Sequence, residues 1–384
     1  MRPRVLFLNH TGALGGGELS LLDLAQDRRD ESTVLLLSDG PLRARLQQGG
    51  VPVRVLRAGR RMMQVRRETR RPSLLVASET LSVGLRLVPC ARRFDVVYAN
   101  SQKAFVAAAV AAPLARRPLI WHLRDILSSD HFSSANVQLV VGLANWLASR
   151  VIANSRATAE AFIAGGGDAR KVRVVYGGVD PAPFDAVGAT DAGAVRRELD
   201  VGAAPLVGVF SRFHPWKGQH VVVEALPRVP SAHVVFVGDA LFGEQEYVDA
   251  VARRAGELGV SDRVHLLGFR PDVPRLMRGM DLVVQPSVAP EPFGRTIVEA
   301  MLSGRAVVAT RAGGAAEILQ HEVTGLLVAP GDPVGLADAL AALFQDAPRR
   351  EAMGRAGADS ARRRFSLAGM LAGVAREIEE VTRQ

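Results

Sequence analysis

Short apolar runs alternate with longer amphipathic stretches along almost the whole chain. This alternation predicts parallel β-strands separated by helices. In the first half the predicted strands are Val5–Leu8, Thr33–Leu37, Val53–Leu56, Asp95–Ala99, Leu119–His122, Val151–Ala153 and Val172–Val175. In the second half they are Leu206–Phe210, Val234–Val237, Val264–Leu267, Leu282–Val284, Ala306–Ala309 and Leu326–Val328. The predicted helices include Glu18–Gln26, Ala104–Leu114, Asn136–Ala148, Gly218–Leu226, Glu244–Leu258, Arg295–Leu302, Ala315–Leu319 and Val334–Phe344.

The alternation breaks between Tyr176 and Thr190, where Gly, Pro, Asp and Ala accumulate as in a linker. A length of 384 residues also favours two domains. We predict α/β architecture with two doubly wound domains facing each other across a cleft, one over residues 1–178 and one over 191–365. Residues 179–190 would link them, and a last helix within 366–384 would pack back on the first domain. Ligands bind such sheets at the carboxyl ends of the strands, so two facing edges would share one site.

The composition is that of a soluble globular protein, with 48% hydrophobic and 23% charged residues. No apolar run approaches the roughly 20 residues that span a bilayer. The N-terminal apolar run, Val5–Leu8, is too short for a signal peptide. The single cysteine, Cys90, excludes an internal disulfide. These features predict a cytoplasmic protein, either free or peripheral on the inner membrane face.

The net charge of +9 is unevenly distributed. Residues 1–178 carry a net +13 (26 − 13), whereas the remainder carries −4 (22 − 26). The densest basic stretch runs from Arg54 to Arg71. It is either a solvated surface or a site of peripheral contact with an anionic membrane or a lipid diphosphate. Nucleic acid is not an expected partner, because no aromatic residues for base stacking are interleaved.

Two carboxylates, Glu291 and Glu299, flank a Phe-Gly turn, Phe293 and Gly294, that opens the helix Arg295–Leu302. Ionised carboxylates accept strong hydrogen bonds from hydroxyl groups, so the pair suits a sugar ring and a ribose. The unpaired N–H groups at the start of the helix suit a diphosphate. Two glutamates at this spacing are common by themselves, but their placement around this turn after a strand is not.

Arg212 and Lys217 lie on one loop that follows the strand Leu206–Phe210. Two cations there would neutralise a departing diphosphate. The alternative is that they are ordinary surface cations. The chain has only three lysines and uses arginine elsewhere, which favours a specific need for a compact charge at Lys217.

In the first domain a glycine turn, Gly15–Gly17, precedes a helix, and His122 ends a strand. Gly16 and Gly17 would allow a ligand to approach the backbone, and His122 would hydrogen-bond a sugar hydroxyl. A structural turn and a structural histidine are the alternatives. Weaker signals in the second domain are Gly238, and Phe269 with Arg270, which follow strands and would present backbone groups to a base.

In this order the motifs resemble the family 4 retaining glycosyltransferases, which have the GT-B fold. The resemblance covers nearly the whole chain and is strongest from Val207 to Pro330. It implies transfer of a sugar from a nucleotide-diphosphate sugar, linked to UDP or GDP, to a hydroxyl acceptor. The pathway would be cell-envelope or exopolysaccharide synthesis, or the glycosylation of a natural product such as an antibiotic.

The resemblance also implies roles for individual residues. Gly16 and Gly17 would contact the donor phosphate, and Arg212 with Lys217 would stabilise the departing diphosphate. Glu291 would contact the donor sugar, His122 would lie near that sugar, and Glu299 would hold the ribose. The catalytic candidates are His122, Arg212, Lys217 and Glu291. The donor-binding candidates are Gly16, Gly17, Gly238, Phe269, Arg270, Phe293, Gly294, Arg295, Thr296 and Glu299.

Two positions depart from the family pattern: Pro292 stands where many members have glycine, and Arg295 where many have an aliphatic residue. Neither DxD nor a histidine cluster is present in the sequence, so no metal or other cofactor is expected. A sugar-nucleotide epimerase of the same architecture and a non-catalytic sugar-nucleotide-binding protein are the alternatives. The acceptor is expected to contact the segment Arg54–Leu87 and the loop Ser128–Ser134.

Overall fold

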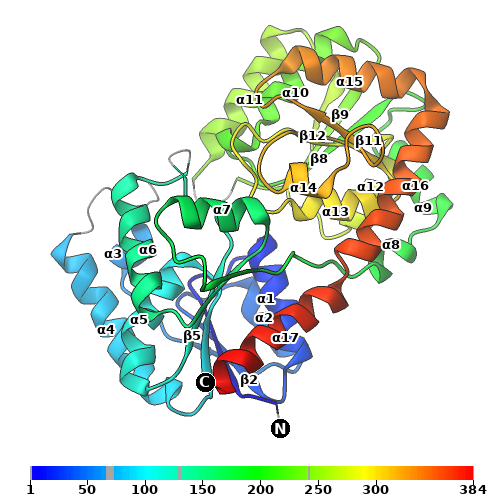
Figure 1. Ribbon diagram of the computed structural model, residues 1–384. Coiled ribbons are helices and arrows are strands. Elements are labelled where there is room, and N and C mark those ends of the chain that lie inside the picture. Colours follow the sequence, from blue (N-terminus) through cyan, green and yellow to red (C-terminus); the bar gives the residue numbers. More distant parts are fainter. Residues whose placement is uncertain (1, 66–72, 129–130, 241–242, 384) are drawn as a thin grey trace. The chain divides into compact units, whose positions relative to one another are not determined.

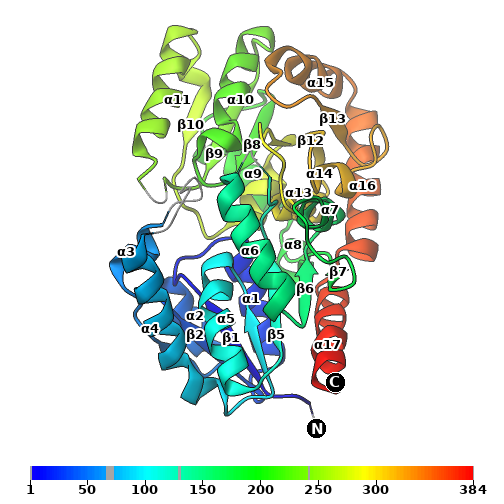
Figure 2. The ribbon, with the colours of Figure 1, turned by 60° about the vertical axis from the view of Figure 1, so that its left-hand side comes forward.

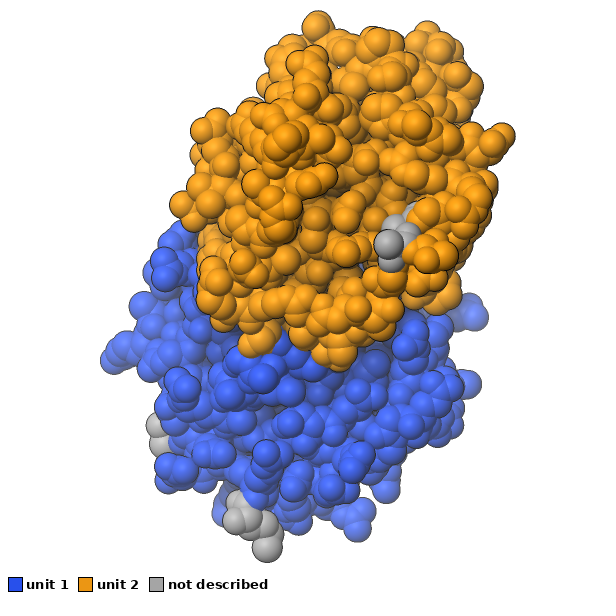
Figure 3. Space-filling model, turned by 90° about the vertical axis from the view of Figure 1, so that its right-hand side faces the viewer, with its two compact units in different colours: residues 1–178, 367–384 blue, residues 179–366 orange. Residues whose placement is uncertain are grey.

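The computed structural model describes residues 2–65, 73–128, 131–240 and 243–383 (Figure 1). The chain divides into two compact units (Figure 3). Unit 1 comprises Met1–Gly178 and Leu367–Gln384, and unit 2 comprises Val179–Ser366. Four arginines of the predicted basic stretch, Arg66, Arg67, Arg70 and Arg71, lie outside the described residues, as do two residues of the predicted acceptor loop, 129–130.

Unit 1 contains a seven-stranded sheet in the order β3-β2-β1-β4-β5-β6-β7, in which every pairing is parallel. Its strands are β1 (Val5–Asn9), β2 (Ser32–Leu36), β3 (Val53–Val55), β4 (Val96–Ala99), β5 (Leu119–Leu123), β6 (Arg150–Ala153) and β7 (Val172–Val174). Its helices are α1 (Gly16–Asp27), α2 (Pro41–Gln48), α3 (Arg60–Gln64), α4 (Leu74–Ala91), α5 (Gln102–Ala115), α6 (Ser134–Leu147), α7 (Arg156–Ala164) and α17 (Leu367–Arg383). The strand order changes direction between β1 and β4, as in a doubly wound sheet.

Successive residues of each strand point to opposite faces of this sheet, and both faces are buried. On β1, Leu6 and Leu8 join the core beneath α4, α5, α6 and α7, whereas Val5 and Phe7 join the core beneath α1, α2 and α17. Figures 1 and 2 show these two helical layers. The stripe Met370, Val374, Ile378 and Val381 attaches α17 to the second layer.

Unit 2 contains a six-stranded sheet in the order β10-β9-β8-β11-β12-β13, again entirely parallel. Its strands are β8 (Leu206–Phe210), β9 (His233–Val237), β10 (Val264–Leu266), β11 (Leu282–Gln285), β12 (Ala306–Thr310) and β13 (Leu326–Val328). Its helices are α8 (Ala182–Asp185), α9 (Ala189–Glu198), α10 (Gln219–Ala225), α11 (Gln245–Glu257), α12 (Val273–Gly279), α13 (Arg295–Leu302), α14 (Ala315–Ile318), α15 (Pro333–Gln345) and α16 (Ala347–Arg364). The change of direction falls between β8 and β11.

The α/β fold class predicted from the sequence is confirmed, and all thirteen predicted strands are present with ends within one residue of the prediction. The segment predicted as a linker, 179–190, holds α8 and the first residues of α9. No helix was predicted between β3 and β4, where the structure has α3 and α4.

Candidate active site

Lys217 and Glu291 form an ion pair in unit 2. The Lys217 Nζ lies 2.9 Å from both Glu291 carboxylate oxygens. Glu291 Oε2 also accepts hydrogen bonds from Gln285 Nε2 and Ser287 Oγ, each at 3.0 Å. The side chains of Lys217 and Glu291 are only 15% and 12% exposed. Three donors therefore fix the carboxylate beside the end of β11, where parallel sheets of this kind bind ligands.

The backbone at Gly218 explains how Lys217 reaches this position. Lys217 ends a short 3-10 turn, Pro215–Lys217, that follows β8. Gly218 has a φ of +74°, and a Cβ atom there would lie 2.1 Å from the carbonyl oxygen of Pro286. Only glycine combines this conformation with so close an approach to another backbone segment. The Lys-Gly sequence thus brings the ammonium group next to the segment that follows β11.

The turn predicted to open a helix begins α13 at Gly294, whose φ is +103°. Phe293 is buried and packs edge-on against Phe365, with 5.8 Å between ring centroids. Glu299, one turn into the helix, accepts a hydrogen bond of 2.8 Å from Arg295 Nε. The arginine that departs from the family pattern is therefore the partner of the second glutamate. Thr296 is half-buried in the first turn.

Arg212, on the loop after β8, pairs with a carboxylate that the sequence analysis did not single out. Its Nη1 lies 2.9 Å from Glu244 Oε1 at the start of α11. His214 Nε2 lies 3.5 Å from the same oxygen. Burial raises the pKa of Glu244, although the nearby Arg212 opposes this shift. Glu244, which lies 32 positions further along the chain, thus neutralises Arg212, the second of the two predicted cations.

The three weaker candidates of unit 2, Gly238, Phe269 and Arg270, differ in the contacts they make. The backbone N–H of Gly238 donates to the carbonyl of Gly268 (2.9 Å), so Gly238 connects two turns at the strand ends. The Phe269 ring is 59% exposed. The Arg270 guanidinium is paired with Glu198 (2.7 Å) and Asp272 (2.9 Å), which raise its pKa. Phe269 is therefore available to a ligand, whereas the Arg270 side chain is held by two carboxylates.

In unit 1, Gly16 and Gly17 are the first residues of α1. Asn100 Nδ2, just after β4, donates to the carbonyl of Gly17 (3.2 Å) and to Asn9 Oδ1 (3.1 Å). Asn9 in turn donates to Glu18 Oε1 (3.2 Å), whose pKa is raised by burial. This asparagine network fixes the start of α1 at the carboxyl end of the sheet, with its N–H groups available to an anion.

His122 lies on β5, and its ring is buried. Its Nδ1 contacts the Tyr98 hydroxyl and lies 3.2 Å from Arg124 Nη2. Because a guanidinium only donates, Nδ1 accepts, and the neutral ring carries its proton on Nε2. Burial and the charge of Arg124 lower the pKa of His122 well below its usual value. His122 is therefore a neutral N–H donor rather than a general base, and Nε2 has no hydrogen-bond partner among the described residues.

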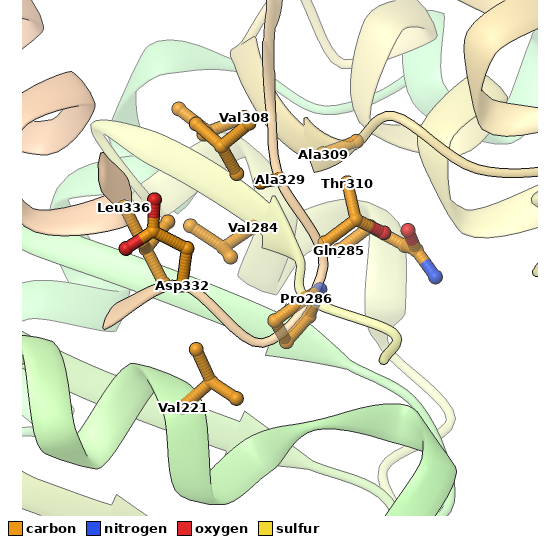
Figure 4. Close-up of a pocket in the computed structure, with 11 residues that line it drawn as sticks. Val221, Val284, Gln285, Pro286, Val308, Ala309, Thr310, Ala329, Asp332 and Leu336 are labelled. Carbon is orange, nitrogen blue, oxygen red and sulfur yellow. The ribbon is translucent and has the colours of Figure 1, made fainter. Parts of the chain in front are cut away.

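A small pocket lies near the carboxyl ends of β11 and β12, and α10 and α15 contribute to its lining (Figure 4). Its lining is largely apolar, including Val221, Val284, Val308 and Leu336. In Figure 4 the Gln285 amide points away from these side chains, and this amide donates to Glu291. The pocket has no space for a water molecule. It is therefore part of the support behind Glu291 and not a substrate site.

The structure thus brings together Lys217 and Glu291, and it pairs Arg212 and Glu299 with separate partners. Gly16, Gly17 and His122 belong to unit 1, and the other candidates belong to unit 2. Gln285, Ser287 and Glu244 carry no sequence motif and were not predicted as site residues. Among the described ranges there is no group of three or more His, Cys, Asp or Glu side chains that could hold a metal ion.

Two protein families match the chain. The family described as Glycosyl transferases group 1 matches residues 195–360, and the family described as Glycosyl transferase 4-like domain matches residues 15–178. HepE of Anabaena, crystallised with UDP and glucose, is 40% identical, with a TM-score of 0.90 over 98% of this chain and 99% of that chain. Sucrose-phosphate synthase from Thermosynechococcus elongatus, 17% identical with a TM-score of 0.80 over 98% and 99% of the two chains, shares the fold.

Curated relatives match over shorter stretches. The lipopolysaccharide core biosynthesis glycosyltransferase LpsE of Rhizobium meliloti is 33% identical over 172 residues, 44% of this chain and 49% of LpsE. The D-inositol 3-phosphate glycosyltransferase of Nocardia farcinica is 34% identical over 217 residues, 54% of this chain and 47% of that protein. The chain therefore spans about half the length of the curated relatives it matches.

Two doubly wound parallel sheets, matched over almost the whole chain by glycosyltransferase structures, define the GT-B class. The chain belongs to the group 1, or family 4, glycosyltransferases.

Proposed function

We propose that the protein transfers a hexose from a nucleotide-diphosphate sugar to a hydroxyl acceptor with retention of the anomeric configuration. The observation that carries this proposal is the buried Lys217–Glu291 pair, fixed by Gln285 and Ser287 at the end of β11. It combines a cation for a departing diphosphate with a rigid carboxylate for sugar hydroxyls. UDP-glucose is the first donor to test, because HepE, 40% identical, has been crystallised with it.

The reaction breaks the bond between the anomeric carbon and the diphosphate oxygen and forms a bond from that carbon to the acceptor oxygen. In the proposed route the acceptor attacks from the face that the diphosphate leaves, and the leaving phosphate oxygen takes the acceptor proton. Lys217 and Arg212 stabilise the negative charge that develops on the diphosphate. Glu291 orients the sugar, and the neutral Nε2–H of His122 is a hydrogen-bond donor that needs no proton transfer. This scheme requires no metal.

The acceptor is a cell-envelope or exopolysaccharide saccharide, or a small natural product such as an antibiotic intermediate. LpsE, whose name places it in lipopolysaccharide core synthesis, supports the envelope alternative. The protein would act in the cytoplasm.

A panel of nucleotide sugars tests the donor. UDP-glucose is expected to raise the melting temperature more than its GDP counterpart and to be hydrolysed slowly without an acceptor. The anomeric proton of the product, followed by NMR, is expected to show the same configuration as the donor. An inverted product contradicts retention, and formation of an epimer from the donor alone favours an epimerase. Failure of every nucleotide sugar to bind contradicts the proposal as a whole.

A further inference from the structure

The outward face of α4 carries four exposed leucines, together with the exposed polar residues Ser78, Ser82 and Arg86. Leu74, Leu75, Leu81 and Leu85 are at least half exposed. Leu74, Leu81 and Leu85 form one stripe, because residues seven and eleven positions apart lie on the same side of an α-helix. Arg86 is the single charged residue at the exposed positions of this helix. We call Leu74, Leu75, Leu81 and Leu85 the leucine face.

The opposite side of α4 is packed into unit 1. Only Val83, Gly84, Leu87 and Ala91 are buried. Gly84 lets the helix approach α5, since a Cβ atom there would lie 2.5 Å from Val110 Cβ. Figures 1 and 2 both show α4 lying along α5. By length and composition α4 is apolar enough to cross a membrane, contrary to the sequence-based expectation. Its fixed inner side suits a helix that lies along an interface.

Three exposed arginines lie on α4 or on the adjacent helix α3. Arg60 and Arg61 on the adjacent α3 are exposed, as is Arg86 on α4 itself. Glu79 is the acidic residue of α4. Its carboxylate already accepts a hydrogen bond from the Met62 backbone N–H (2.9 Å) and lies 3.8 Å from Arg61. The charge around the exposed leucines is therefore predominantly positive.

We propose that the leucine face of α4 docks on the surface of an anionic lipid bilayer. Leucines enter the boundary between headgroups and acyl chains, while Arg60, Arg61 and Arg86 attract anionic headgroups. A second copy of the chain fits this surface less well, because two leucine faces in contact would bring two sets of arginines together. The docking would hold unit 1 at a membrane whatever the acceptor is.

Co-sedimentation with vesicles tests this docking. The wild-type protein is expected to bind vesicles that contain phosphatidylglycerol, and to bind them less as salt screens the charges. The variant L81E/L85E is expected to bind at least about tenfold less, because two carboxylates would have to enter the interface. The matched control is L139E/W146E, which adds the same charge to exposed apolar positions of α6 and is expected to retain binding.

Several results would overturn the docking: no binding by the wild-type protein, equal binding to pure phosphatidylcholine, or loss of binding only in the α6 control. Thermal melting checks that each variant is folded. A wild-type dimer in solution that L81E/L85E converts to a monomer would instead assign the leucine face to self-association.

Glu244 and Glu291 are held by different numbers of hydrogen bonds, and what we infer from this difference rests on the proposed function. Glu291 is held by Lys217, Gln285 and Ser287, whereas the hydrogen-bonded partner of Glu244 is Arg212 alone among the described residues. Oε2 of Glu244 is buried without a hydrogen-bond partner among those residues. The two predicted diphosphate cations thus have unequal counterions: Glu291 is fixed by three hydrogen-bond donors, whereas Glu244 has one hydrogen bond, from Arg212, and the longer contact of 3.5 Å with His214.

We infer that Glu244 is an exchangeable counterion for Arg212, which the donor diphosphate displaces on binding. A diphosphate and a carboxylate compete for the same guanidinium, and their like charges repel. Arg212 and His214 are the charged or titratable groups within ion-pair distance of Glu244 in the described chain. Displacement would make Glu244 a determinant of donor affinity that does not contact the reacting atoms.

The variant E244Q tests this exchange by calorimetry with UDP and uridine. We expect UDP to bind about fivefold more tightly to E244Q than to the wild type, because a neutral amide competes less for Arg212. Uridine, which lacks phosphates, should bind both proteins equally. Burial raises the pKa of Glu244. The difference in UDP affinity should therefore shrink as the pH falls through this pKa, because a protonated Glu244 resembles glutamine.

The matched control is E257Q, which removes the same charge from an exposed position of α11 and should leave UDP binding unchanged. Unchanged or weaker UDP binding to E244Q, with normal binding to the wild type, would overturn the exchange alone. Failure of the wild type to bind UDP would instead contradict the proposed donor, and the exchange with it.

Discussion

Replacing Lys217 by alanine should lower kcat by about 10²–10³, or about 2.7–4 kcal/mol of transition-state stabilisation. The ammonium group lies 2.9 Å from Glu291, and the Lys217 side chain is only 15% exposed, so water would replace its charge poorly. The carboxylate would keep its hydrogen bonds from Gln285 and Ser287 and stay in place. The loss should therefore appear in kcat more than in the binding of uridine. Steady-state kinetics with the preferred donor, together with calorimetry, measure the two effects.

The matched control for this variant is Lys171→Ala in unit 1. Lys171 Nζ donates to the backbone carbonyls of Asn145 and Ala148, so its loss affects local packing and not the donor site. Normal kcat is expected for this control. Near-normal turnover in the Lys217→Ala variant would contradict the role of Lys217 at the diphosphate.

Replacing Arg150 by methionine should lower the free energy of unfolding by about 3–5 kcal/mol, because it leaves a buried carboxylate without its cation. Arg150 opens β6, and its Nε and Nη2 lie 2.9 Å from Glu377 and Glu380 of α17. The Arg150 and Glu377 side chains are 7% and 9% exposed. This cluster attaches the C-terminal helix to the sheet of unit 1. Urea denaturation, followed by fluorescence of Trp121 and Trp146 in unit 1, measures the change.

The double variant R150M/E377Q should recover most of this stability, since it removes the buried charge as well. Burial raises the pKa of Glu377 in the folded protein. Arg150 opposes this shift, so its removal should raise the pKa of Glu377 further. Ionisation of a carboxyl group with a raised folded-state pKa costs stability in full above that pKa, and the cost is lost as the pH falls below it toward the pKa of the unfolded chain. The R150M variant should therefore approach the wild type at mildly acidic pH.

Breaking the exposed Arg362–Asp185 pair instead should cost at most about 1 kcal/mol. A comparable loss in R362M would contradict the importance of burial.

The strands were predictable because each is a short apolar run, buried on both faces, between polar segments. Phe7 and Leu8 illustrate this, since they enter different cores but are both fully buried. Helix α4 was not predicted, because exposed leucines on its outer side blur the contrast with its buried side. Leu81 and Val83 differ little in sequence character but differ completely in burial. A periodic pattern is harder to recognise in a helix whose exposed side mixes leucines with polar residues such as Ser78 and Ser82.

For the candidate site, the sequence predicted that Lys217 and Glu291 lie together, but not which residues pair with the other candidates. Lys217 and Glu291 are 74 residues apart and were expected in one site, and the structure pairs them directly. Glu244 was not expected at Arg212, because no local pattern links residues 32 positions apart in different strand–helix units. The tautomer of His122 also depends on Tyr98, which is 24 residues away and carries no motif. These contacts arise from the packing of strand ends, which a single sequence does not encode locally.

Unit 2 begins and ends at almost the same point. Val179 forms a parallel bridge with Ser366, and its N–H donates to the carbonyl of Phe365 at 3.0 Å. The chain therefore enters and leaves this unit through adjacent backbone positions, so the unit is an uninterrupted insertion into the other. A continuous segment of this kind is an inserted domain whose two ends lie side by side. Evolution, or an engineer, can exchange residues 179–366 for the equivalent piece of another enzyme through two neighbouring junctions, without rebuilding the rest of the chain.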